Sequence, residues 1–313
     1  MVRSIIEKLF LERKARIKVR VAYNNLINSL PFYIALENGY FEAEGIQVES
    51  SLYQNAPEVT SALLSGKADL GMPIATAELF MAEAKAPNNM ELFIGIGETK
   101  KFRFWRILVK KDSKIKSLDD IKNVKIGTIT GITGEIYIKL LFEEIFGQNK
   151  AKIVKLKTSQ WLAALKSGKV DALFSVEPIT TIAIKSNLAR SIADAPLVKY
   201  FHEPIIPIGF AMSKEFISKN PETAEKIVTI VKKAIVYMKL NPDQNKRILA
   251  KYADLPESFT REILPNDMIA GVYVDAKQWQ EDIQFIANHL HRKGWINKKV
   301  NVSDIIYKKR QIS

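Results

Sequence analysis

Residues 22–48 read AYNNLINSLPFYIALENGYFEAEGIQV, and this stretch decides the fold. Alternating polar and apolar residues just before it predict a strand over residues 17–22, followed by a polar loop. Pro31 is expected as the first residue of a helix, where its missing N–H group costs nothing. The Asn-Gly pair at 38–39 ends that helix, and a second strand is expected over residues 46–49. The stretch therefore predicts a strand, a loop, a helix and a strand in succession.

The end of such a unit occurs twice in the chain. LLSGKADLG at residues 63–71 corresponds to LKSGKVDAL at residues 165–173. In each copy an apolar helix meets Ser-Gly-Lys, where glycine takes the turn, and a short strand begins at the aspartate. A strand and a polar loop that leads into a helix precede each copy, over residues 19–29 and 124–134. The repeat predicts two α/β lobes of like construction.

Two extended segments are expected to cross between the lobes, over residues 98–109 and 203–211. Helices that begin near Pro221 and Asp275 are expected to pack on the first lobe. The expected division is a basic N-terminal extension at 1–16, lobe I at 17–102 and 207–313, and lobe II at 103–206.

Composition excludes several classes of protein. The 313 residues are 47% hydrophobic and 26% charged, which suits a globular chain of two domains. The chain has no cysteine, which rules out a disulfide framework, a thiolate nucleophile and cysteine-based metal sites. The net charge of +13 comes from scattered lysines without a nucleic-acid motif, so nucleic acid is not an expected partner. No apolar run has the length of a signal peptide or a membrane span.

Ligands of parallel α/β sheets bind where loops leave the carboxyl ends of strands. Loops of this kind are expected at residues 23–29, 73–76, 128–134 and 175–178. TGITG at 130–134 suits an anionic group, because small residues let backbone N–H groups approach and the next helix adds its positive end. The alternative for that segment is an ordinary glycine-rich turn.

The ligand-binding candidates are Tyr23, Asn28, Ser29, Thr76, Thr130, Gly131, Thr133 and Glu177. For Asn28, Ser29 and Thr76 the alternative role is helix capping, and for Tyr23 it is packing between sheet and helix. Glu177 is expected either to accept a hydrogen bond from a ligand or to join the lobes. Trp105 and Trp161 are expected in the core or hinge rather than as pocket walls. The three histidines form no metal set or catalytic triad by spacing, so no catalytic residue, metal or cofactor is predicted.

Several motifs together carry a family resemblance: Asn28, PFYIA at 31–35, NGYF at 38–41, EGI at 44–46, the two SGKxD turns and VEP at 176–178. They resemble the type II periplasmic binding proteins of ABC importers, in the branch that serves aliphatic sulfonates, taurine, nitrate and thiamine-precursor pyrimidines. The resemblance covers about residues 17–300. It implies a monomeric two-lobed clamp that closes on one small molecule without covalent chemistry and serves an ABC transporter permease.

The resemblance leaves alternatives open. Some proteins that resemble this fold are cytosolic enzymes, namely a pyrimidine synthase of thiamine biosynthesis and lyases of a menaquinone route. The synthase relies on a cysteine-rich motif and a histidine, whereas this chain has no cysteine. Pyrimidine-binding relatives carry an acidic-aromatic pair where this chain has Ala22-Tyr23, which favours a small anion over a thiamine-precursor pyrimidine. The resemblance implies the periplasm or cell surface, and the missing signal peptide keeps the cytoplasm as an alternative.

Overall fold

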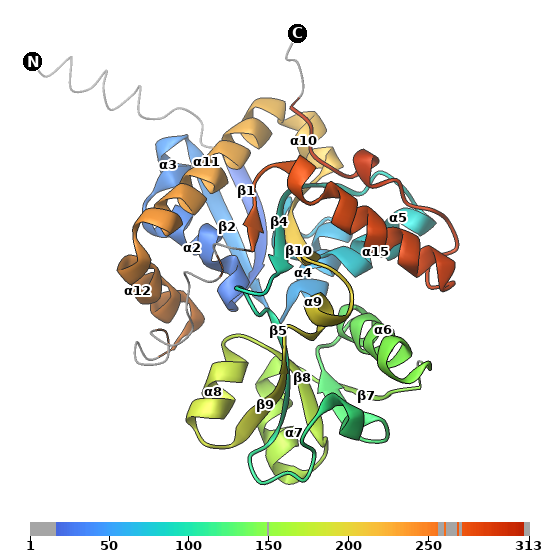
Figure 1. Cartoon of the computed structure of the whole chain (residues 1–313). Helices are drawn as coiled ribbons and strands as arrows, with labels where there is room; N and C mark the ends of the chain where they lie inside the picture. Colours follow the sequence, from blue (N-terminus) through green and yellow to red (C-terminus); the bar gives the residue numbers. More distant parts are fainter. Residues whose placement is uncertain (1–16, 149, 256–259, 261–267, 269–270, 310–313) are drawn as a thin grey trace, which may run out of the picture.

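The computed structural model describes residues 17–148, 150–255, 260, 268 and 271–309. The expected N-terminal extension lies outside the described residues. Figure 1 shows two lobes, one above the other, joined by chain segments close to the start of β5. Each lobe is built on its own mixed sheet, so the expected two-lobed α/β fold is confirmed.

The sheet of lobe I has the strand order β11-β4-β10-β3-β1-β2. These strands are β1 (Ile17–Asn24), β2 (Ile46–Tyr53), β3 (Leu70–Ala75), β4 (Met90–Glu98), β10 (Ile205–Ser213) and β11 (Val272–Tyr273). β1 is parallel to β2 and β3, whereas β10 is antiparallel to β3 and β4. β1 and β2 run further than predicted, because the two strands stay paired as far as Asn24 and Tyr53.

The sheet of lobe II has the order β7-β6-β8-β5-β9. Its strands are β5 (Trp105–Lys110), β6 (Lys125–Thr128), β7 (Lys152–Lys155), β8 (Ala172–Val176) and β9 (Ala189–Asp194). β6 is parallel to β7 and β8, and β5 is antiparallel to β8. Both lobes therefore combine a parallel core with an antiparallel strand next to a crossing.

The two Ser-Gly-Lys-x-Asp turns make the same backbone clasp. In lobe I the backbone nitrogen of Asp69 donates to the Arg20 carbonyl at 2.8 Å, and the Asp69 carboxylate accepts from the Arg20 backbone nitrogen at 2.9 Å. In lobe II Asp171 makes both bonds with Lys125, each at 2.8 Å. The glycine before each clasp has a positive φ angle, 70° and 76°. The sequence repeat thus fixes how each helix returns to its sheet.

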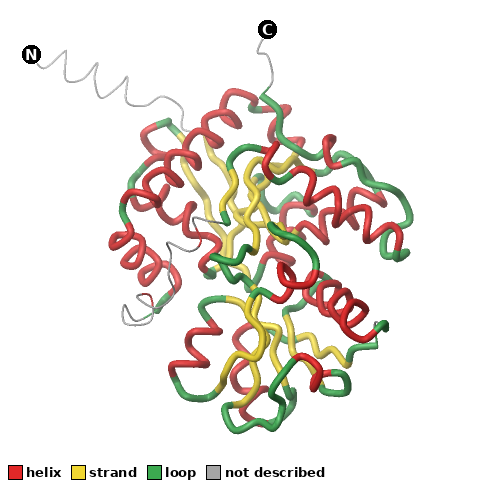
Figure 2. Tube along the Cα trace, in the orientation of Figure 1, coloured by secondary structure: helices red, strands yellow, loops and turns green. Residues whose placement is uncertain are grey.

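Helices cover both sheets, as Figure 2 shows in red. Those of lobe I are α2 (Leu30–Glu37), α3 (Tyr40–Ala43), α4 (Ala56–Leu64), α5 (Thr76–Lys85), α10 (Lys214–Lys219), α11 (Pro221–Leu240), α12 (Pro242–Ala253) and α15 (Gln280–Arg292). Those after the first crossing are α6 (Thr133–Phe146), α7 (Trp161–Ser167), α8 (Ile179–Lys185) and α9 (Pro196–Tyr200). α11 packs on α2, and α15 packs on β10, so both late helices contact elements of lobe I. No helix in the described ranges is long and apolar enough to cross a membrane.

The chain crosses between the lobes twice. The first crossing follows β4 through residues 99–104 into β5, and the second leads from α9 into β10. A single extended crossing over residues 98–109 was expected, but the chain bends between two strands because each strand pairs with a different sheet. At the start of β5, Trp105 stacks on Phe174 with ring centroids 4.2 Å apart. This stack anchors the crossing in lobe II.

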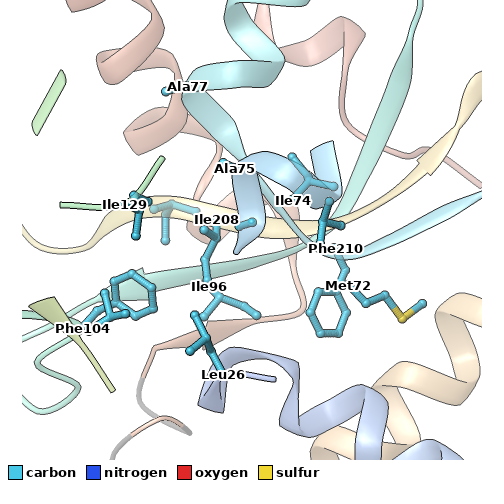
Figure 3. Packing of buried hydrophobic residues seen from close by; sticks show 14 of the residues in the cluster. Leu26, Met72, Ile74, Ala75, Ala77, Ile96, Phe104, Ile129, Ile208 and Phe210 are labelled. Carbon is cyan, nitrogen blue, oxygen red and sulfur yellow. The ribbon is translucent and has the colours of Figure 1, made fainter. Parts of the chain in front are cut away.

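The buried apolar cluster is continuous across the crossings. Figure 3 shows part of it, with Leu26 and Ile208 of lobe I near Phe104 and Ile129. All four side chains line the same small cavity. The core of lobe I therefore reaches directly to the surface that faces lobe II.

Candidate functional site

The candidate site is a cleft between the lobes. A small cavity of about 20 Å³ lies at its centre. Its lining residues are Leu26, Asn28, Asn55, Ala56, Pro57, Ala75 and Ile208 from lobe I, with Phe104, Trp105, Ile129, Thr133 and Val176. Most of these residues follow or end β1, β2, β3, β6 and β8, whereas Phe104 and Trp105 lie at the start of β5 and Ile208 lies within β10. The cavity therefore lies where the sequence analysis expected loops to leave the carboxyl ends of parallel strands. A cavity of this size holds about one water molecule, so the lobes are closed on each other.

A wider groove of about 250 Å³ opens beside this cavity and shares Leu26 with it. Tyr53 and Gln54 line it from lobe I, and Thr158 and Ile179 line it from lobe II. The Thr158 hydroxyl lies 3.4 Å from the Gln54 carbonyl, across the groove. The groove is therefore the open end of the closed cleft, at the boundary between the lobes. Larger hollows at α3 and α11, and at α4 and α10, lie on lobe I away from the cleft.

Residues 130–134, the segment expected to bind an anion, already contact a carboxylate side chain of lobe I. The Glu78 carboxylate accepts hydrogen bonds from the backbone nitrogens of Ile132 at 2.8 Å and Thr133 at 3.2 Å. The Thr133 hydroxyl also donates to this carboxylate. Burial raises the pKa of the Glu78 carboxyl group, and these hydrogen bonds oppose the rise. Glu78 thus caps the first turn of α6 across the lobe boundary.

Thr130 and Gly131 complete this contact. The Thr130 hydroxyl accepts from the Asn55 amide at 2.8 Å and lies 3.3 Å from the Glu58 carboxylate. Gly131 has a φ angle of 87°, and a Cβ atom there would lie 2.5 Å from Pro57 Cβ and 2.6 Å from a Glu78 oxygen. Only glycine fits this closed arrangement without displacement. We call the contact of residues 130–133 with Asn55, Pro57, Glu58 and Glu78 the latch.

In the loop after β1, Asn28 and Ser29 have different surroundings. Asn28 lines the cavity, and its buried Oδ1 atom has no hydrogen-bond partner among the described residues. The Ser29 hydroxyl lies 3.1 Å from both the Asn24 side-chain oxygen and the Met72 carbonyl. Asn24 in turn accepts from the Leu26 backbone nitrogen at 3.1 Å. Ser29 and Asn24 therefore shape the loop, and Asn28 is left with an acceptor that no described residue uses.

The side chains of Tyr23 and Thr76 make their contacts with other residues of lobe I. The Tyr23 ring packs against Phe32 and Tyr33, with centroids 5.3 and 6.0 Å away. The buried Thr76 hydroxyl lies 3.1 Å from the Ile206 carbonyl and 3.0 Å from the Pro207 carbonyl. Thr76 thus ties the start of α5 to the second crossing.

The Glu177 side chain makes its contacts with other residues of lobe II. Its carboxylate accepts from the Thr181 backbone nitrogen at 3.1 Å and lies 3.7 Å from the Arg106 guanidinium. Burial raises the pKa of the Glu177 carboxyl group, while Arg106 and Thr181 act in the opposite direction. The expected link between the lobes is made by Glu78 instead. Sequence reasoning missed Glu78 because an acidic residue in the first turn of α5 is explained by its own helix.

Two further carboxylates hold the crossings. Glu98, at the end of β4, is fully buried and accepts from the Trp105 backbone nitrogen at 3.1 Å. Burial raises the pKa of the Glu98 carboxyl group well above its ordinary value. Backbone N–H groups at the start of α9 have the opposite, smaller effect and lower this pKa. Asp282 on α15 accepts from the Ile206 backbone nitrogen at 2.7 Å, and burial raises its pKa to about 8. We call these contacts around the two crossings the hinge.

Two mixed sheets, two crossings and a cleft at the strand ends define a periplasmic-binding-protein fold. The alkanesulfonate-binding protein SsuA of Xanthomonas axonopodis pv. citri, solved bound to MOPS, matches 93% of this chain and 98% of its own, with a TM-score of 0.78 and 18% identity. The profile of the NMT1/THI5-like family matches residues 26–245. The chain therefore belongs to the NMT1/THI5-like family.

Curated relatives of this chain include binding proteins and enzymes. A putative binding protein of Brucella abortus is 24% identical over 70% of this chain, and the match spans 66% of that relative, just under two thirds. A putative aliphatic sulfonates-binding protein of Bacillus subtilis is 23% identical over 88% of this chain and 82% of its own length. A 4-amino-5-hydroxymethyl-2-methylpyrimidine phosphate synthase of Saccharomyces cerevisiae is 24% identical over 68% of this chain and 64% of its own length. Family membership thus leaves binding and catalysis to be decided at the site.

Proposed function

We propose that this chain is the solute-binding component of an ABC-type importer, which closes its lobes on one small organic molecule and delivers it to a membrane permease. The observation that carries the proposal is the latch around the central cavity. Its hydrogen bonds join residues that are 54 to 75 positions apart and belong to different lobes. Contacts that form only on closure let a solute in the cleft shift the lobes toward the closed arrangement.

We propose that Asn28 orients the solute, beside Asn55 and Thr133, which line the same cavity and are engaged in the latch. They lie among apolar and aromatic side chains, a composition typical of small-molecule sites. A buried acceptor without a partner costs about 1–3 kcal/mol. A solute that donates a hydrogen bond to Asn28 removes this cost, which favours binding.

The kind of solute is the finer part of the proposal. The sequence favours a small anion such as a sulfonate, taurine or nitrate, with a thiamine-precursor pyrimidine as the alternative. An anion at residues 130–134 competes with the Glu78 carboxylate for the N–H groups of Ile132 and Thr133. Binding without turnover, by a monomer in the periplasm or at the cell surface, completes the proposal.

The experiment is a thermal-shift panel on wild-type protein with alkanesulfonates, taurine, nitrate, pyrimidines and riboflavin. A true ligand at a hundred times its Kd stabilises the protein by about 2.7 kcal/mol. We expect it to decrease the radius of gyration in X-ray scattering as well. Mass spectrometry of the incubated solute separates the alternatives, because a new product would support the family's enzymes over a binding protein.

A matched pair of variants locates the site. Asn28→Ala should weaken binding by about one to two decades, since one buried hydrogen bond to the solute is lost. Asn38→Ala removes an amide that donates to the Ile34 carbonyl at the end of α2, away from the cleft. Its affinity should equal that of wild type. Equal affinity in both variants would place the solute elsewhere.

A further inference from the structure

The first turn of α6 is satisfied from the opposite lobe. α6 has 14 residues, and no side chain of its own N-terminal residue caps it. The first N–H groups of a helix carry partial positive charge and attract anions. Here Glu78 supplies that negative charge at 2.8 Å and 3.2 Å from two of these nitrogens. The most favourable place for an acidic group in the cleft is therefore taken by the protein itself.

The space at this place is also filled. A Cβ atom built on Gly131 would come within 2.6 Å of a Glu78 oxygen, so the carboxylate lies directly against the loop. Thr133 contributes both its N–H group and its hydroxyl to Glu78. A sulfonate or carboxylate of a solute cannot reach these donors unless Glu78 leaves them.

The rest of the cleft offers no positive charge in exchange. None of the described residues that line the small cavity or the groove beside it is lysine or arginine. Arg106, on the neighbouring strand β5, is already engaged by Glu177 at 3.7 Å and Asp194 at 3.5 Å. An anionic solute would lose its hydration without gaining a counter-charge, which is costly in a closed site. A neutral or cationic solute avoids this cost.

We infer that Glu78 determines the charge selectivity of the cleft: it excludes acidic groups from the N-terminus of α6, so the solute that binds here is neutral or cationic. This inference rests on the proposed solute-binding function and reverses the anion that the sequence favours.

The test uses methanesulfonate as the probe, with sodium chloride at equal ionic strength as the salt control. Wild type should show no thermal shift with methanesulfonate beyond the salt control. Glu78→Ala frees the N–H groups of Ile132 and Thr133, so its methanesulfonate affinity should rise at least tenfold. Glu78→Gln is the second variant, for use if the alanine variant does not fold. It loses the charge but keeps an acceptor, so a smaller rise in methanesulfonate affinity, about threefold, is expected.

Glu58→Ala is the matched control, because it removes another latch carboxylate but frees no N–H group of α6. It should respond to methanesulfonate as wild type does. Equal gains in the Glu58 and Glu78 variants, no gain in either Glu78 variant, or tight methanesulfonate binding by wild type would each overturn the inference. Failure of the proposed function looks different: no solute of the panel stabilises wild type, yet Glu78→Ala still gains anion affinity.

Discussion

The hinge and the latch both use a lobe I carboxylate that accepts a backbone N–H group beyond the first crossing. In the hinge, Glu98 accepts from Trp105, only seven positions away. In the latch, Glu78 accepts from Ile132, which is 54 positions away. Because the hinge bond closes a short loop, we expect it to persist if the lobes separate. The latch bond joins the two lobes directly, so we expect it to break. We therefore expect hinge variants to change the stability of the fold and latch variants to change the closure of the cleft.

The largest effect is expected at the hinge, from Trp105→Ala. Trp105 is 1% exposed and stacks on Phe174, so its removal leaves a cavity where the chain enters lobe II. The free energy of unfolding should fall by about 3–5 kcal/mol, measured by urea unfolding.

Trp295→Ala is the control for this first prediction. Trp295 is partly exposed and contacts Lys139, with the ammonium 4.9 Å from the ring centroid. A cation–π contact of this kind is worth about 0.5–1 kcal/mol at an exposed site. Equal losses in the two tryptophan variants would contradict the special weight that we give to the hinge.

The second prediction concerns pH. Burial raises the pKa of Glu98 in the folded protein well above its ordinary value, so folded protein holds this proton at pH values where unfolded protein has lost it. Stability therefore falls as pH rises above about 4.5, by up to about 1.4 kcal/mol per pH unit, until the folded pKa is passed.

Glu98→Gln removes this titration and keeps a hydrogen-bond acceptor for Trp105. The difference in unfolding free energy should therefore grow in favour of the variant as the pH rises above about 4.5. Comparing the two proteins at the same pH cancels the other raised carboxyl groups, such as Asp282 and Glu177. Parallel curves for wild type and variant would show that Glu98 does not titrate in this way.

The fold and the position of the cleft were predictable from the sequence because both depend on local signals. The glycine of each Ser-Gly-Lys-x-Asp turn and the aspartate that follows it act within a short stretch, and strand direction then places the loops. The partner of each polar loop residue was not predictable. A hydroxyl such as that of Thr76 looks the same in sequence whether it faces a ligand or, as here, the carbonyls of Ile206 and Pro207.

Glu78 is a second example of a contact partner that the sequence does not reveal. The sequence suggested residues 130–134 for the anionic group of a ligand, with an ordinary glycine-rich turn as the alternative. In the structure the Glu78 carboxylate, 54 positions before Ile132, accepts from this segment instead. Nothing in the spacing of Glu78 from the repeats tells which lobe its carboxylate faces. The chemistry of a loop can thus be inferred from its residues, while its partner depends on how the lobes close.

The third prediction tests the latch through Gly131→Ala. A Cβ atom at this position would collide with Pro57 and Glu78 of the opposite lobe in this closed arrangement. We expect solute affinity to fall by about one to two decades, because overpacking costs about 1–3 kcal/mol. X-ray scattering should show a larger radius of gyration than for wild type.

Gly147→Ala is the matched control for Gly131→Ala. Gly147 follows the other end of α6 with a φ angle of 66°, and nothing lies within 4 Å of a Cβ atom built there. It shares the backbone strain of alanine at positive φ but not the collision between the lobes. Both variants should lose similar stability, and only Gly131→Ala should lose solute affinity. An equal loss of affinity would mean that strain, not closure, decides binding.

The smallest effect is expected at the outer edge of the lobe boundary, from Lys293→Ala. Lys293, just after α15, pairs with Glu143 of α6, and both side chains are 36% exposed. Exposed ion pairs are worth about 0–1 kcal/mol, since water and salt screen them and two long side chains must be held in place. Solute affinity should therefore stay within about threefold of wild type, with the remaining difference removed by raising the salt concentration. A loss of solute affinity as large as that of Gly131→Ala, persisting at high salt, would contradict this prediction. It would show that closure depends on the edge where α15 meets α6 and not on the latch.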